Sequence, residues 1–236
     1  MRRSSLSLVA SALAFTALSL SAAPRARASI VDLSAQVGLE KRSLSTTDYA
    51  NAPFGQLDVD FGIIPGLLYL GPYANYAQLR PILATKDNAD VPNSSKFYGF
   101  GLRARLNIPI PEVPITPYGV VGGGMVHTDF PDQTVQLCTP ATTVAGVTVA
   151  PQCASQTLPA ATANFVELMF AAGVRLDLSD TVRIVLEGAW KPTFGYQNDT
   201  WELAAHGATT TGNLNPPPPG RNGYALSASA GLMISL

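Results

Sequence analysis

Hydrophobic and polar residues alternate along six segments of the chain, and a period of two is the signature of β-strands. The six segments are residues 33–40, 57–63, 98–107, 166–177, 182–187 and 224–236. Two further segments, 67–77 and 116–127, also have strand character, although their pattern does not define two faces. We therefore predict eight strands of about ten residues each, the length that a tilted membrane-spanning strand requires.

Charged side chains distinguish the two faces of the predicted strands. Every charge in the alternating segments and at their ends lies at a polar position, and none lies at an apolar position. If each strand chose its facing freely, such agreement would arise by chance on the order of once in a hundred. The charged residues are Asp32, Glu40, Asp58, Asp60, Arg103, Arg105, Glu167, Arg175, Asp177, Arg183, Glu187 and Lys191.

The polar face suits the inside of a barrel better than it suits water. A soluble barrel of the lipocalin type shows the same alternation with its apolar face inside. Here the polar face is rich in Gly, Ala and Ser, which fits a crowded interior, and it lacks the Lys and Thr of a solvated sheet. Aromatic residues near one set of strand ends predict a girdle at a membrane interface, and they are Phe54, Tyr76, Phe97, Tyr98, Phe130, Phe165, Trp190, Phe194 and Tyr224.

The connections between the predicted strands alternate in length. The short ones are residues 64–66, 109–115 and 179–181, and the long ones are 41–53, 78–96, 128–163 and 193–221. Short turns on the periplasmic rim and long loops on the outer rim are typical of outer-membrane barrels, so both ends of the barrel are expected at the short-turn rim. Residues 144–150 alternate enough to be an extra hairpin strand within the longest loop.

The N-terminal segment has the three parts of a secretory signal peptide. Arg2 and Arg3 precede an apolar stretch at 8–18, and Ala26-Arg27-Ala28 supplies the small residues that a signal peptidase reads. We predict cleavage after Ala28, which leaves residues 29–236 as the barrel domain. The apolar stretch is shorter than the ~20 residues of a membrane helix.

Composition narrows the class of protein further. Hydrophobic residues make up 47% of the chain, and charged residues only 13%, against roughly 25% in ordinary globular proteins. After the predicted signal peptide, 11 basic and 16 acidic residues leave a net charge of −5. These values exclude a disordered chain and argue against a nucleic-acid partner. No run of ~18 apolar residues follows Ala28, so no membrane helix is expected there.

With these features the chain resembles the small eight-stranded outer-membrane β-barrels of the OmpA/OmpX type. The resemblance covers residues 29–236 and is carried by the signal peptide, by the segments 70–73, 99–105 and 117–124, and by the terminal strand. It implies an all-β, antiparallel, up-and-down transmembrane barrel, with outer-membrane lipid, lipopolysaccharide and the barrel assembly machinery as partners. Such barrels typically end in an aromatic residue, whereas this chain ends in Leu236. No peptidoglycan-binding domain follows, so no cell-wall tether is expected.

Nine charged residues are the candidates for a network inside the barrel. An eight-stranded barrel has room only for side chains, and buried charges must pair because an unpaired one costs several kcal/mol. We predict an ion-pair network that plugs the lumen, with a narrow gated pore as the alternative. The residues are Asp58, Asp60, Arg103, Arg105, Glu167, Arg175, Asp177, Arg183 and Glu187.

The two cysteines, Cys138 and Cys153, lie in the longest predicted loop. In an oxidising compartment they are expected to form a disulfide. Closing a loop of about 15 residues restricts the unfolded chain by roughly 3 kcal/mol, and this bridge would stiffen the loop rather than the barrel. No CxxC motif or histidine cluster accompanies them, so no metal, cofactor or redox role is expected.

The histidines raise an enzymatic alternative. His127 and His206 are the only two in the chain, and His127 is followed by Thr128-Asp129 near the outer rim. Some small outer-membrane barrels modify lipid A with such residues, but the sequence contains no recognisable triad.

Residues 119–124 lack the features of a phosphate-binding loop, and Pro216–Pro219 indicates a stiff spacer.

The sequence therefore predicts a non-enzymatic outer-membrane barrel with a structural or surface-interaction role through long extracellular loops. A pore for ions or small solutes, a lipid A-modifying enzyme and a soluble ligand-binding barrel are the alternatives. The extracellular partner is not identified by the loop sequences, because loop sequence encodes binding specificity poorly.

Overall fold

The computed structural model describes residues 30–44, 47–82, 94–111, 113–138, 142–144, 147–149, 153–196 and 222–236. The predicted signal peptide, His206 and the proline spacer lie outside the described residues, so those three predictions remain as they stand. In the described part of the chain, no helix has the length and apolar character needed to cross a membrane.

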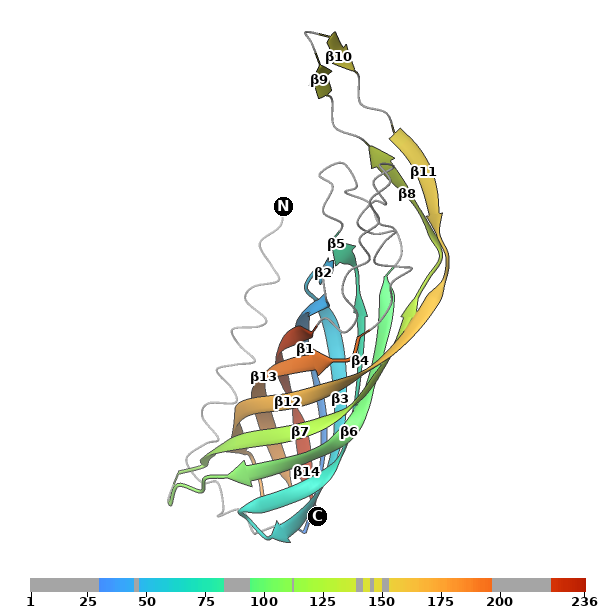
Figure 1. The fold of residues 1–236 in the computed structure, drawn as a ribbon. Coiled ribbons are helices and arrows are strands. Elements are labelled where there is room, and N and C mark those ends of the chain that lie inside the picture. Colours follow the sequence, from blue (N-terminus) through green and yellow to red (C-terminus); the bar gives the residue numbers. More distant parts are fainter. Residues whose placement is uncertain are drawn as a thin grey trace, which may run out of the picture.

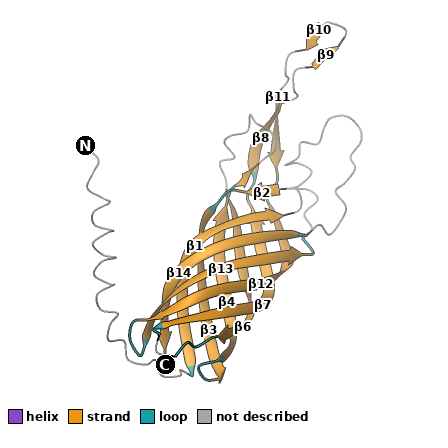
Figure 2. Cartoon of the chain, turned by 90° about the vertical axis from the view of Figure 1, so that its left-hand side faces the viewer, coloured by secondary structure: helices purple, strands orange, loops and turns teal. Residues whose placement is uncertain are grey.

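Eight long antiparallel strands form a closed barrel in the described part of the chain (Figures 1 and 2). Each strand pairs with its neighbours in the chain order, and the last strand pairs with the first to close the sheet. The predicted eight-stranded up-and-down barrel is therefore confirmed. The strands are β1 (Val31–Leu44), β3 (Ala52–Ile64), β4 (Leu68–Leu79), β6 (Ser95–Asn107), β7 (Ile115–Phe130), β12 (Ala161–Asp177), β13 (Val182–Phe194) and β14 (Gly223–Ser235).

The alternation in the sequence becomes the two surfaces of this barrel. Along β3, Asp58 and Asp60 are buried inside, while Leu57 and Phe61 are 63% and 48% exposed on the outer wall. The same inversion holds for β6, where Arg103 is buried. Along these strands the charged residues therefore face the interior and large apolar residues face outward, the reverse of a soluble barrel.

Three tight connections join the strands at one rim, as predicted. The β3–β4 turn contains Gly66 with φ of 83°, a left-handed conformation that glycine adopts without strain. The same rim holds both ends of the barrel, where the Ile30 N–H donates to the Leu236 carbonyl oxygen at 3.0 Å. We refer to this rim as the turn rim and to the opposite one as the loop rim.

The strands are longer than the predicted ten residues, with 12 to 17 residues each. The segments 41–53, 78–96, 128–163 and 193–221 were expected to be loops, but strand structure continues into all four of them. In β1 the reason is that buried and more exposed positions continue to alternate through residues 41–44. Six short strands occur there, namely β2 (Thr47–Tyr49), β5 (Pro81–Ile82), β8 (Gln133–Cys138), β9 (Thr142–Val144), β10 (Val147–Val149) and β11 (Cys153–Leu158).

The segment 128–163 contains a two-stranded ribbon, in which β8 pairs with β11. The ribbon extends beyond the loop rim as a continuation of β7 and β12 (Figure 1). The extra hairpin strand expected at 144–150 corresponds to β10, which pairs with β9 in a short hairpin of three residues on each side. The ribbon register places Cys138 opposite Cys153, and directly opposed residues lie within disulfide reach. Their side chains lie outside the described ones, so the disulfide stays a prediction.

The predicted aromatic girdle is correct for only some of its members. Five aromatic side chains are 38% to 50% exposed on the outer wall, namely Tyr76, Tyr98, Trp190, Phe194 and Tyr224. Phe54, Phe97, Phe130 and Phe165 are instead at most 5% exposed and pack inside the barrel. Each of these four lies an even number of positions from the inward-facing residues of its strand, a relation that we call inward parity. The side that each one faces therefore follows from alternation and not from its height in the barrel.

Glycines in β6 and β7 allow close approach of neighbouring strands. A Cβ added at Gly124 would lie 2.1 Å from the Phe100 carbonyl oxygen, whereas one added at Gly119 would meet nothing within 4 Å. We expect Gly124→Ala to lower the free energy of unfolding by about 1–3 kcal/mol, because the backbone must shift. Gly119→Ala is the matched control and should leave that free energy nearly unchanged. Urea unfolding in lipid vesicles measures both, and equal effects would contradict the close-approach argument.

Candidate functional site in the barrel lumen

Charged side chains from five strands form an ion-pair network near the turn rim. Arg103 lies at its centre, since its guanidinium contacts Asp60 at 2.7 Å, Asp58 at 3.0 Å and Glu187 at 3.8 Å. Asp58 also accepts hydrogen bonds from Ser34 and Gln56 at 2.7 and 3.0 Å. The position of Arg103 follows from its inward-facing place on β6, which is separated from the carboxylates of β3 only by β4.

The network continues from Arg103 to the strands that close the barrel. Arg105 contacts Asp60 at 2.9 Å and also pairs with Asp32. Asp32 in turn binds Arg183 at 3.1 Å, and Arg183 contacts Asp177 at 3.0 Å. Arg175 reaches the same Asp177 at 3.2 Å. We call this set the lower network, and it consists of Asp32, Asp58, Asp60, Arg103, Arg105, Arg175, Asp177, Arg183 and Glu187.

A second, smaller network lies nearer the loop rim. Arg42 contacts Glu40 at 2.9 Å and Glu167 at 2.8 Å, and Lys191 contacts Glu40 at 3.0 Å. All four side chains are at most 2% exposed. These residues, Glu40, Arg42, Glu167 and Lys191, are the upper network. It contains two acids and two bases, so its charges balance.

Aromatic and apolar side chains separate the two networks and cover the upper one. Tyr73, Tyr118 and Met169 pack together inside the barrel, and the Tyr118 hydroxyl donates to Glu187 at 3.1 Å. At the loop end, the Arg42 guanidinium lies 5.0 Å from the Phe97 ring, and the Lys191 ammonium lies 4.9 Å from the Phe54 ring. A larger cluster fills that end of the lumen and includes Leu44, Tyr49, Leu79, Phe130, Phe165 and Tyr196.

The packing leaves little room for water in the described lumen. A water-filled channel exposes the side chains that line it, yet Arg42, Arg103, Arg105, Arg183 and Lys191 are each less than 2% exposed. Seven acids and six bases are buried among the residues that the structure describes. Each buried charge would be costly alone, so its partners are what make its burial tolerable.

The structure places all nine predicted lumen residues on the inner wall. Eight of them belong to the lower network, and Glu167 belongs to the upper one. Asp32, Glu40 and Lys191 were recognised as polar-face charges but were not included in the predicted network. Arg42 was missed because residues 41–53 were predicted to be a loop, although Arg42 continues the inward parity of Glu40.

His127 faces outward, away from the lumen, at the level of the aromatic girdle. Its ring nitrogens lie 2.8 Å from the Asn164 amide oxygen and 3.1 Å from an Asp129 carboxylate oxygen. The ring also lies 6.3 Å from that of Tyr98. Thr128 points inward and is buried, so it does not share the face of His127. Among the described residues, no group of three or more His, Cys, Asp or Glu could hold a metal ion.

Comparison with solved structures found several chains that are similar to this one. Neisserial surface protein A matches with a TM-score of 0.54 at 13% identity, over 89% of this chain and 99% of that chain. The attachment invasion locus protein Ail of Yersinia pestis matches with a TM-score of 0.39 at 13% identity, over 86% and 97% of the two chains. The N-terminal β-barrel domain of Pseudomonas aeruginosa OprF gives a TM-score of 0.33 at 12% identity, over 86% and 97%.

No protein-family model matches the chain, and the search of curated protein sequences returned no match.

Proposed function

We propose, from the premise that this chain has the fold of the small eight-stranded outer-membrane β-barrels, that it is an integral outer-membrane protein. The outer wall supports this placement. Val37, Leu57 and Leu102 are 72%, 63% and 61% exposed, and they belong to a continuous apolar surface around the barrel. Soluble monomers rarely expose apolar patches larger than a few hundred Å², whereas lipid solvates such a surface well.

The barrel acts through its outer surfaces rather than through its lumen. The observation that carries this proposal is the occlusion of the lumen by the lower and upper networks, with the aromatic cluster above them. An open conduit would need these paired charges to separate and their carboxylates to lose their cations. The structure of the interior therefore supports a scaffold better than a pore.

The loop rim is the surface best placed to meet a partner. The β8–β11 ribbon extends well past that rim (Figure 2), and loops on a rigid scaffold are where binding residues concentrate. The name of the similar Neisserial protein describes it as a surface protein. We propose a surface-interaction or structural role for this chain, with the partner contacting the ribbon and the neighbouring loops.

Conductance in planar lipid bilayers tests the proposal. We expect the purified protein to give no discrete conductance steps, because no water-filled path crosses the paired charges. The sample must first migrate differently on a gel before and after boiling, which shows that the inserted barrel is folded. Discrete steps that weaken in Arg103→Ala would instead support the pore. Absence of any heat-dependent shift, together with recovery in the soluble periplasm, would contradict the membrane placement itself.

A further inference from the structure

The barrel wall is interrupted between β3 and β4, close to the loop rim. Pairing of these strands ends where Phe54 lies opposite Ala77, and strand pairing resumes where Tyr49 of β2 lies opposite Pro81 of β5. Four residues, 50–53, separate these two pairs on one side, but only three, 78–80, separate them on the other. Pro53 lies in the longer segment and has no N–H to donate to a ladder. The extra residue forms a bulge, and bulges are common at barrel rims.

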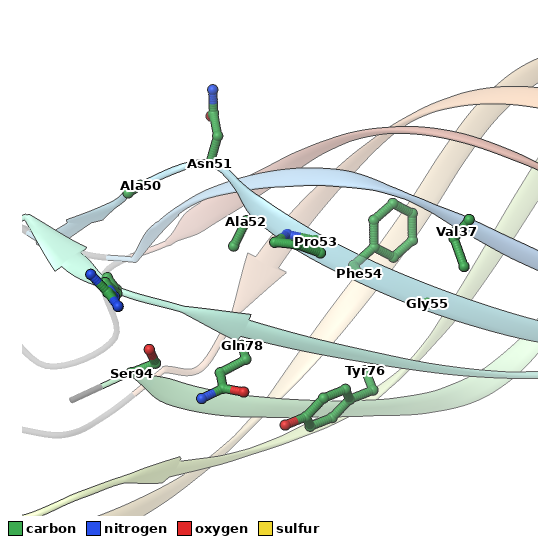
Figure 3. A pocket seen from close by; sticks show the side chains of 11 residues that line it. Val37, Ala50, Asn51, Ala52, Pro53, Phe54, Gly55, Tyr76, Gln78 and Ser94 are labelled. Carbon is green, nitrogen blue, oxygen red and sulfur yellow. The ribbon is translucent and has the colours of Figure 1, made fainter. Parts of the chain in front are cut away.

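A groove opens on the outer wall at this interruption, with a volume of about 770 Å³. Val37, Gly55 and Tyr76 line the end nearer the middle of the barrel, and Gln78 lies nearer the loops (Figure 3). Gly55 faces outward, and a Cβ added there would meet only the Gln36 carbonyl oxygen at 3.8 Å. The missing side chain at Gly55 is therefore one reason why the wall is hollow at this point.

A cation lies at the loop end of the groove. Arg80 lines the groove, and its backbone carbonyl accepts a hydrogen bond from the Ala50 N–H at 2.9 Å. Its side chain is exposed and forms no ion pair with any other described residue. Tyr76 also lines the groove and packs against Tyr98, with ring centroids 5.2 Å apart. Aromatic residues of this kind mark the level of lipid headgroups, so Arg80 lies close to the plane of the lipid phosphates.

We propose that this groove binds one lipid with an anionic phosphate headgroup from the outer leaflet. The Arg80 guanidinium donates hydrogen bonds to the phosphoryl oxygens, and Gln78 lies beside the same headgroup. An acyl chain of the lipid lies over Val37 and Gly55, where the groove continues into the apolar wall. The proposal rests on the proposed membrane placement. Continuity with the lipid-facing wall favours a lipid over a soluble ligand, and the positive charge favours an anionic headgroup.

Lipid retention measured by native mass spectrometry tests this site. The full protein is exchanged in detergent against equal amounts of dimyristoyl phosphatidylglycerol and dimyristoyl phosphatidylcholine. We expect one retained phosphatidylglycerol and about fivefold less phosphatidylcholine, the ratio given by one basic residue at a membrane surface. Arg80→Gln should lower phosphatidylglycerol retention about fivefold, to the level of phosphatidylcholine. Gly55→Leu fills the groove and should abolish retention of both lipids.

Matched variants separate the groove from general effects. Lys41→Gln removes another exposed cation, and Gly188→Leu adds a side chain at another outward-facing glycine, where the nearest atom is 4.0 Å from a Cβ. Both should retain lipid as the unmodified protein does. The proposal is overturned if Arg80→Gln and Gly55→Leu retain as much phosphatidylglycerol as the unmodified protein does. It is also overturned if the unmodified protein retains no lipid.

The gel shift on heating and the cell fraction distinguish failure of this proposal from failure of the proposed function. A folded barrel in the outer membrane that retains no phosphatidylglycerol overturns the groove alone. A soluble protein without a heat-dependent shift overturns the membrane placement, and the groove proposal with it.

Discussion

Arg103→Met is expected to lower the free energy of unfolding by about 3–5 kcal/mol, the usual cost of leaving a buried charge without its partner. Methionine keeps most of the side-chain volume but removes the cation from Asp58, Asp60 and Glu187. Asp60 keeps its contact with Arg105 at 2.9 Å. The other two carboxylates lose the one cation that contacts them among the described residues, and they retain only uncharged donors such as Ser34 and Tyr118.

Urea unfolding in lipid vesicles measures this loss, and Lys41→Met provides the control. Lys41 is exposed on the outer wall of β1, so its replacement should change the free energy of unfolding by no more than about 0.5 kcal/mol. Adding Asp58→Asn to Arg103→Met should recover part of the loss, because it removes one of the uncompensated charges. Similar small losses for Arg103→Met and Lys41→Met would show that the lower network does not depend on ion pairing.

The upper network should respond to Arg42→Met by a similar amount, about 3–5 kcal/mol. Arg42 is the cation that contacts Glu167, at 2.8 Å, whereas Glu40 is also held by Lys191 at 3.0 Å. Removing Arg42 therefore leaves Glu167 buried without a contacting cation in the described part of the chain. Lys191→Met should cost less, because Glu40 keeps Arg42.

A double-mutant cycle distinguishes ion pairing from packing in the upper network. Glu167→Gln added to Arg42→Met should restore much of the lost stability, and contacting charged residues typically show coupling energies of 0.5–3 kcal/mol. The same urea titration supplies all four values of the cycle. Additive losses, with no recovery in the double variant, would mean that Arg42 stabilises the barrel by packing on Phe97 rather than by neutralising Glu167.

Alternation alone predicts the fold and the facing of most side chains in this chain. A residue two positions from Asp58 must face the same side, so Asp60 could be assigned to the interior without a structure. Parity also places Phe54 and Phe97 inside, and the girdle prediction was wrong for them because it considered only their position along the strands. Arg42 could have been found in the same way, by extending the parity of β1 beyond Glu40.

The pairing of the lumen charges could not be predicted from the sequence. Asp32 and Arg183 are 151 residues apart and meet over β14, which lies between their strands. Their heights depend on the stagger of the closed sheet, which alternation does not encode. The groove between β3 and β4 could not be predicted from the sequence either. It depends on a one-residue change of register near Pro53, and a proline in a strand is compatible with an edge, a strand start or a bulge.

The closing contact between β1 and β14 has a consequence for how accurately the barrel assembles. Asp32 of β1 lies opposite Ser235 of β14, and it accepts a hydrogen bond from the Ser235 hydroxyl at 2.6 Å while also binding Arg183 of β13 and Arg105 of β6. A slip of one residue at this closure would turn Asp32 toward lipid, and a slip of two would move it along the barrel axis away from both arginines. The buried charges thus favour the correct register of β1 against β14, since only that register brings Asp32 to both arginines.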